Sequence, residues 1–165
     1  MARPIPVKPE VGQESVWDYP RPPRLERTDR QIQVVFNNVV IADSRRAWRV
    51  LETSHPPVYY IPPEDIDIQH LKEATGGSWC EWKGQASYCD VVSGEQVAKR
   101  AAWYYGRPAP AFRQIKDHVA FYPWAMDECL VDGESVRPQP GEFYGGWITD
   151  DIVGPFKGEP GTSGW

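Results

Sequence analysis

The stretch QIQVVFNNVVIA, residues 31–42, decides the fold of this chain. Ile32, Val34 and Phe36 alternate with polar or exposed positions, which is the period of a strand with one buried face. The Asn37-Asn38 pair tolerates positive φ angles and therefore suits the turn of a tight hairpin. We predict a β-hairpin in which residues 39–42 form the return strand.

Short apolar and aromatic runs, bounded by Pro, Gly, Asn or Asp, recur on both sides of this hairpin and favour further strands. Residues 45–52 fit either a strand or one face of a helix, and we favour the strand. Gly94-Glu95 and Asp132-Gly133 suit two more turns. The other predicted strands cover residues 58–61, 85–92, 98–105, 118–122 and 128–131.

One short helix is expected from Pro63 to about Ala74. Glu64 and Asp65 would lie in its first turn, where the helix dipole favours acidic side chains, and Gly76-Gly77 would end it. The 17 Pro and 14 Gly disfavour longer helices, whereas eight Trp favour pleated surfaces. The predicted class is mainly β, a β-rich α+β fold: one compact barrel-like or tent-like sheet domain with one short helix.

Length and charge narrow the possible functions. The length of 165 residues suits one domain. The net charge is −5, whereas a protein that binds nucleic acid needs a basic face. No apolar run approaches the ~20 residues of a membrane span, and residues 1–10 lack the apolar central run of a secretory signal. We therefore expect a cytoplasmic protein that binds neither nucleic acid nor membrane. Three cysteines in such a protein are expected to be reduced thiols.

The chain divides into three segments by composition. Residues 1–28 form a proline-rich extended arm that contains Trp17 and Tyr19, and residues 29–136 form the β-rich domain. Residues 137–165 form a tail in which aromatics punctuate the glycines, so we expect this tail to pack back on the domain. The arm either covers the chain's own surface or reaches a partner, which would make a homodimer through the arm or the tail. Trp82-Lys83-Gly84 has a short echo in Phe156-Lys157-Gly158.

Several sequence blocks between Gln31 and Glu134 form a specific set. They are Val40–Ser44 with Arg46-Ala47 and Leu51-Glu52, Val58–Pro62 with Glu64-Asp65, Cys80–Gly84 with Ala86 and Tyr88, Ala102–Tyr105 with Pro108, and Val119–Pro123. Together they resemble the family called domain of unknown function 427, which is also labelled nucleotidyltransferase-like. The resemblance implies a compact β-rich fold, a barrel or tent-like sheet arrangement with little helix, and no settled activity.

The residues give no support to nucleotidyl transfer. That chemistry needs a phosphate-binding turn and carboxylates that hold a divalent metal. Gly76-Gly77-Ser78 is similar to such a turn, but no acidic pair follows it on a nearby strand. Asp65 and Asp67 precede it, where acids serve a helix start. No phosphate-loop signature is present either.

Residues 78–88 hold the densest group of reactive side chains. If this segment is extended, Cys80, Trp82 and Gly84 share one face. Lys83 is then either an anion-binding or Schiff-base amine beside a glycine that admits a ligand, or a solvated lysine next to a bulge. Cys80 is either a nucleophile, with His55, His70 or His118 as its base, or a buried thiol.

Other candidate residues lie elsewhere in the chain. Arg45 or Arg46 binds an anionic ligand, or the charged strand end closes a salt bridge with Glu52 or Glu64. Scattered cysteines leave open a zinc site assembled from distant ligands, although the close spacing of structural zinc ligands is missing. We predict no metal and no cofactor. Four strand aromatics either line a pocket or fill the core: Tyr60, Trp103, Tyr105 and Tyr122.

The preferred interpretation is a module that binds an unidentified small planar or anionic molecule near Lys83. The candidate binding residues are Lys83, Cys80, Trp82, Arg46, Glu52, Tyr60, Trp103, Tyr105 and Tyr122. No set of base, nucleophile and orienting group is apparent, so whether the protein is an enzyme stays open. A structural or protein-interaction module is the competing class, and it would present a flat apolar patch instead of a concave pocket.

Overall fold

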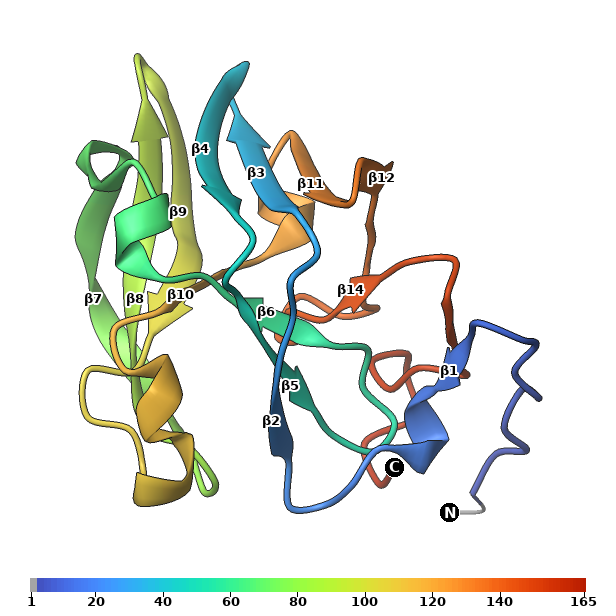
Figure 1. Cartoon of the computed structure of the whole chain (residues 1–165). Helices are drawn as coiled ribbons and strands as arrows, with labels where there is room; N and C mark the ends of the chain where they lie inside the picture. Colours follow the sequence, from blue (N-terminus) through green and yellow to red (C-terminus); the bar gives the residue numbers. More distant parts are fainter. Residues whose placement is uncertain (1–2) are drawn as a thin grey trace.

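The computed structural model describes residues 3–165, and strands dominate it (Figure 1). This part of the chain forms five sheets and five short 3₁₀ helices, and it contains no α-helix. The mainly β class is confirmed, but none of the five sheets closes into a barrel. Within the described residues, no helix is long and apolar enough to cross a membrane. The 3₁₀ helices are η1 (Val16–Asp18), η2 (Pro63–Asp65), η3 (Ile68–His70), η4 (Pro110–Ile115) and η5 (Pro123–Ala125).

The predicted hairpin forms one half of a four-stranded sheet. Strands β3 (Ile32–Phe36) and β4 (Val39–Ser44) pair antiparallel, and the φ angles of Asn37 and Asn38 are 53° and 61°. This confirms the hairpin, because asparagine tolerates the left-handed region that the turn requires. The sheet runs in the order β12-β11-β3-β4 and is completed by β11 (Glu128–Val131) and β12 (Glu134–Ser135).

A second four-stranded sheet lies beside the first, in the order β10-β9-β8-β7 (Figure 1). The largest apolar cluster is built from residues of both sheets, including Val34, Ile41, Val91 and Phe121, all at most 1% exposed. Burial of these side chains from two sheets drives their association. The strands of the second sheet are β7 (Leu71–Cys80), β8 (Gly84–Ser93), β9 (Gln96–Tyr104) and β10 (Val119–Phe121).

The prediction of a helix from Pro63 to about Ala74 is wrong. Only the single 3₁₀ turns η2 and η3 form, and β7 begins at Leu71. Pairing with β8 overrides the local signals, because Leu71 lies opposite Val91 and gains ladder hydrogen bonds that an isolated helical turn does not have. Gly76-Gly77 does not end a helix: the register shifts between Glu73 and Gly77, and Gly76 has a φ of +83°.

A third sheet has the order β2-β5-β6, and the two ends of the chain lie on its side of the molecule (Figure 1). Its strands are β2 (Arg24–Arg27), β5 (Trp48–Leu51) and β6 (Val58–Tyr60), so the strand favoured within residues 45–52 is confirmed. Two small sheets complete the fold. Parallel strands β1 (Glu14–Ser15) and β15 (Ile152–Val153) form one, and antiparallel strands β13 (Arg137–Pro138) and β14 (Trp147–Ile148) form the other.

The first and last segments of the chain contact one another. The indole of Trp17 donates a hydrogen bond of 2.9 Å to the carbonyl of Pro155, and its ring lies 5.5 Å from that of Trp165. Trp17 and Tyr19 are each 8% exposed within an apolar cluster that includes Leu51. The arm and the tail therefore share a small core on the third sheet, although residues 1 and 2 of the predicted arm lie outside the described part.

Candidate functional site

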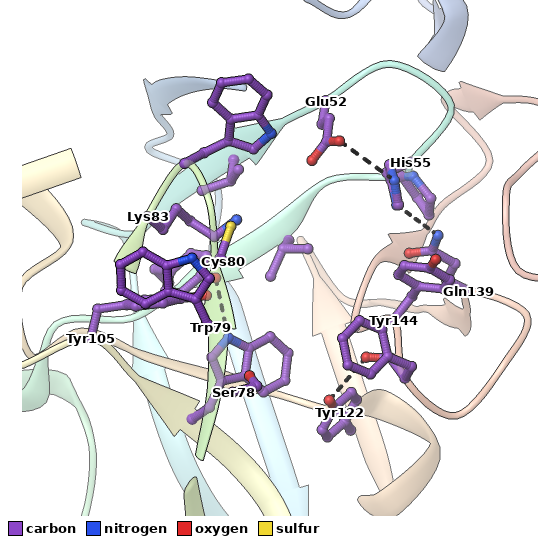
Figure 2. Close-up of a pocket in the computed structure, with 18 of the residues that line it drawn as sticks. Glu52, His55, Ser78, Trp79, Cys80, Lys83, Tyr105, Tyr122, Gln139 and Tyr144 are labelled. Atoms are coloured by element: carbon purple, nitrogen blue, oxygen red, sulfur yellow. Dashed lines mark hydrogen bonds and ion pairs between the residues drawn. The ribbon is translucent and has the colours of Figure 1, made fainter. Parts of the chain in front are cut away.

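A cavity of about 480 Å³ opens between the β7–β8 hairpin and the tail. Figure 2 shows Lys83, Cys80 and Trp79 on one side of it and His55, Gln139 and Tyr144 on the other. Strands β5, β6 and β9 supply its inner wall. Eight of the nine candidate residues line this cavity, and Arg46 is the exception. Those eight are Lys83, Cys80, Trp82, Glu52, Tyr60, Trp103, Tyr105 and Tyr122.

The segment around Lys83 turns instead of running straight. Cys80 lies opposite Gly84 across the β7–β8 ladder, and residues 81–83 form the hairpin turn. The expected extended alternation of faces is therefore wrong here, and the turn brings Cys80, Trp82 and Lys83 to the same cavity. Gly84 has a φ of +109°, and a Cβ atom there would lie 3.3 Å from the carbonyl oxygen of Arg107. Its close neighbour is thus the chain's own backbone.

Aromatic rings form the inner wall and are at the same time part of the core. The Trp103 indole donates a hydrogen bond of 3.2 Å to the hydroxyl of Tyr60, and the two rings are nearly perpendicular at 88°. The ring centroids of Trp103 and Tyr122 lie 4.5 Å apart. Burial raises the pKa of the Tyr60 and Tyr105 hydroxyls well above its usual range. The wall is rigid and uncharged, which suits the face of a planar group.

Two lysines approach the cavity from opposite segments of the chain. Lys83 comes from the hairpin, with its Nζ 5.9 Å from the centre of the Tyr105 ring. Lys157 comes from the tail, with its Nζ 5.8 Å from the centre of the Tyr144 ring. Among residues 3–165, neither ammonium forms an ion pair with an Asp or Glu side chain, and Nζ of Lys157 donates a hydrogen bond of 3.4 Å to the backbone oxygen of Trp165. The short sequence echo around these two lysines therefore has a spatial counterpart, since both line one cavity.

His55 lies in the loop after β5, with its side chain 13% exposed. Burial is the main cause that lowers its pKa to about 3, and the positive charges of Lys157, Arg21 and Lys83 lower it further. Its Nδ1 atom lies 3.0 Å from Nε2 of Gln139, and its ring packs edge-on against Tyr144 at 5.1 Å. From the sequence, His55 was predicted only as one possible base for Cys80.

Glu52 and Arg46 have separate ion-pair partners. Glu52 pairs with Nε of Arg21 at 3.3 Å and lines the cavity. Arg46 instead pairs with Asp65, with distances of 2.7 Å and 3.1 Å, and its hydrogen bonds lower the pKa of that carboxyl. The expected strand-end salt bridge therefore forms with Asp65 instead of Glu52 or Glu64. Arg46 is 56% exposed at that place and does not contact the cavity.

The three cysteines are free thiols in different surroundings. Cys80 is partly exposed in the cavity, whereas Cys89 and Cys129 are buried in the core. Burial raises the pKa of the Cys89 thiol to about 11 and raises that of Cys129 further. No group of three or more His, Cys, Asp or Glu side chains within the described residues is arranged to hold a metal ion.

Tail residues were missing from the sequence-based set. Gln139, Tyr144 and Lys157 all line the cavity, although the tail was expected only to cover the domain. No local pattern marks them, because their position depends on contacts with distant segments, such as the hydrogen bond from the Lys157 backbone to the carbonyl of Ser54. Only the lysine echo gave a signal that pointed to one of them.

Comparison with known proteins gives one result on identity. A comparison with curated proteins finds no match. A family model matches residues 24–132, which span most of the sheets and include the cavity residues from Val50 to Tyr122. Because this match covers more than half of the chain, the protein belongs to the family described as Domain of unknown function (DUF427).

Proposed function

We propose that the cavity binds a small planar molecule that carries negative charge. The observation that supports this most directly is a pair of lysines, Lys83 and Lys157, on two sides of one aromatic cavity, with no Asp or Glu side chain of the described residues paired to either. An ammonium that has no carboxylate side chain beside it gains most when an anion binds there, since the attraction strengthens away from bulk water.

The size and lining of the cavity agree with such a ligand. Its volume of about 480 Å³ lies within the range of small-molecule sites, which are largely apolar with a few polar groups. The rings of Tyr60, Trp103 and Tyr122 are held by one another, so little conformational entropy would be lost when they contact a flat ligand. Preorganised walls of this kind favour rigid planar molecules over flexible chains.

A second candidate function is docking of a protein partner at the mouth of the cavity. Trp79 is 72% exposed and Phe143 is 68% exposed, and both line the cavity opening. Exposed aromatics of this kind anchor many interfaces. A partner, including a second copy of this chain, would cover both rings, whereas a small ligand would leave most of their outer surface in water.

The test uses benzoate as the simplest planar anion. We expect its titration to shift the indole ¹H–¹⁵N signals of Trp82 and Trp103 in a saturable way. Lys83→Ala and Lys157→Ala should each weaken binding about tenfold or more, the usual loss for a charge-assisted contact. Lys99→Ala is the matched control, because Lys99 is exposed and lies outside the cavity.

Two other outcomes decide against the proposal. No saturable shift at high millimolar benzoate would exclude this class of ligand. A dimer in solution that protects Trp79 and Phe143 from solvent, combined with no benzoate binding, would favour the docking function instead.

A further inference from the structure

Gln139 fixes the proton of His55. The Gln139 side chain belongs to a residue that is 2% exposed, and every hydrogen-bonding atom of its amide has a partner. Its Oε1 accepts from the backbone N–H of Gly146 at 3.1 Å, and its Nε2 donates to the carbonyl of Lys157 at 2.8 Å. A flipped amide would place oxygen against oxygen and N–H against N–H, so only one orientation satisfies the site.

In that orientation the second Nε2 hydrogen of Gln139 points to Nδ1 of His55, at 3.0 Å. Nδ1 must accept this hydrogen bond, so the neutral imidazole carries its proton on Nε2. A second proton on Nδ1 would face the Gln139 N–H directly. His55 is therefore held as a hydrogen-bond donor through Nε2.

The Nε2 donor of His55 has an acceptor nearby that it does not reach. The closest carboxylate oxygen, Oε2 of Glu52, is 3.8 Å away, beyond hydrogen-bonding distance, and both residues line the cavity (Figure 2). Glu52 pairs with Arg21 at 3.3 Å. A carboxylate in an ion pair can only accept hydrogen bonds, so Glu52 offers the cavity an acceptor. The wall thus presents one fixed donor beside one fixed acceptor.

An oxygen atom that donates and accepts fits between them. Placed roughly 2.8 Å from both His55 Nε2 and Glu52 Oε2, it would see the two atoms at an angle of about 85°, which a hydroxyl oxygen tolerates. A second carboxylate there would be repelled by Glu52, and an ammonium would face the His55 N–H. An ether oxygen would accept from His55 but could not donate to Glu52.

We infer that His55 and Glu52 together bind a hydroxyl group, and that the ligands of this cavity are planar aromatic acids with a ring hydroxyl, of the hydroxybenzoate type. This inference rests on the proposed function, because the lysines must bind the carboxylate of the same molecule. The pair adds selectivity: a ligand without the hydroxyl leaves the partly buried His55 donor without a partner and leaves Glu52 with Arg21 alone.

The experiment compares dissociation constants of benzoate, 3- and 4-hydroxybenzoate, and 3- and 4-methoxybenzoate, measured on the full chain by the same indole signals. We expect one hydroxybenzoate to bind at least about tenfold more tightly than benzoate, and the methoxy compounds to show no such gain. His55→Phe and Glu52→Ala should each bring the ratio of the two constants close to one while benzoate still binds. Because the two dissociation constants are compared within each variant, a loss of affinity that affects both ligands equally does not change their ratio.

Controls separate the two proposals. Glu64→Ala removes an exposed carboxylate outside the cavity and should leave the ratio unchanged. Lys83→Ala should weaken benzoate and hydroxybenzoate alike and keep their ratio. If benzoate binds and depends on Lys83, but neither hydroxybenzoate binds more tightly, the inference is overturned and the proposed function stands. It is also overturned if methoxy compounds gain equally or if the ratio survives in Glu52→Ala. If none of the five compounds binds, the proposed function itself fails.

Discussion

The side-chain amide of Gln139 donates a hydrogen bond of 3.0 Å to Nδ1 of His55, which joins the tail to the loop after β5 (Figure 2). These residues are 84 positions apart in the chain. The contact orients a mostly buried imidazole, and it makes the tail part of the cavity wall. Removing the tail would therefore change the chemistry of the site as well as its shape.

The stability of the protein should depend on the ionisation of His55. The pKa of His55 is about 3 in the fold, below its usual value of about 6.5. The unfolded chain then binds a proton between these values and the folded chain does not, so stability is full above pH 6.5 and is lost as the pH falls. Between pH 7 and pH 5 this residue should remove about 2 kcal/mol from the free energy of unfolding.

Urea titrations followed by tryptophan fluorescence at the two pH values measure this loss. His55→Phe should reduce the pH dependence by the same amount, whereas His118→Phe should keep it. The groups that act on His55 are Gln139, Glu52, Lys157, Arg21 and Lys83. An equal loss of stability in the wild type and in His55→Phe would show that His55 does not cause it.

The three thiols should react at very different rates. Cys80 is partly exposed in the cavity, while burial raises the pKa of Cys89 to about 11 and also raises that of Cys129. Because the thiolate is the reactive form, iodoacetamide should modify Cys80 first in the folded protein and all three thiols in urea. Peptide mass spectrometry identifies the sites. Rapid modification of Cys129 under native conditions would contradict the packing described above.

The tail requires a glycine where it crosses the aromatic wall. A Cβ atom on Gly145 would overlap the ring of Trp103. Gly145→Ala should therefore cost roughly 1–3 kcal/mol of unfolding free energy, the usual penalty of overpacking, and should weaken benzoate binding. Gly164→Ala is the control, because nothing lies within 4 Å of the added Cβ atom there. Comparable stability of the two variants in urea would mean that the tail moves freely away from Trp103.

Arg49 connects the arm to the third sheet. Its side chain is 7% exposed and pairs with Glu14 at 3.0 Å and with Glu26. Arg49→Leu leaves two carboxylates without their cation, and we expect a loss of about 2–3 kcal/mol, below that of a fully buried pair because both carboxylates reach solvent. Thermal unfolding and limited proteolysis of the arm report the effect.

The exposed pair between Arg137 and Asp150 provides the contrast. These side chains are 55% and 83% exposed, so Arg137→Leu should cost less than about 1 kcal/mol. If both arginine variants lost the same stability, burial of Arg49 would not be the reason for its effect.

Local patterns were sufficient for eight of the fifteen described strands, and β7 is the longest of those that they did not reveal. The β3–β4 hairpin was predictable because strand alternation and the positive-φ tolerance of Asn37 and Asn38 indicate the same structure. Strand β7 was not, because Glu64 and Asp65 before it resemble a helix start, and Gly76-Gly77 within it resemble a helix end. Pairing with β8 decided its conformation, and that pairing is invisible in the residues of β7 alone.

The candidate site divides in the same way. Lys83, Cys80 and the strand aromatics were identified from their density along the chain, and the cavity brings them together. Arg46 was wrongly included among the binding residues, because no pattern in the sequence shows that its side chain pairs with Asp65. Gln139, Tyr144 and Lys157 were missed, since nothing in an aperiodic tail shows which part of the domain it will contact.

By itself, the sequence determined the β class, the β3–β4 hairpin and the chemical character of the β7–β8 segment, because these depend on side-chain period, turn residues and local composition. Only the tertiary structure decided where the tail lies, how the proton of His55 is fixed by Gln139, and that Lys83 and Lys157 line one cavity. Those features depend on contacts between residues far apart in the chain. Such contacts form only when burial of apolar surface folds the sheets and the tail against one another.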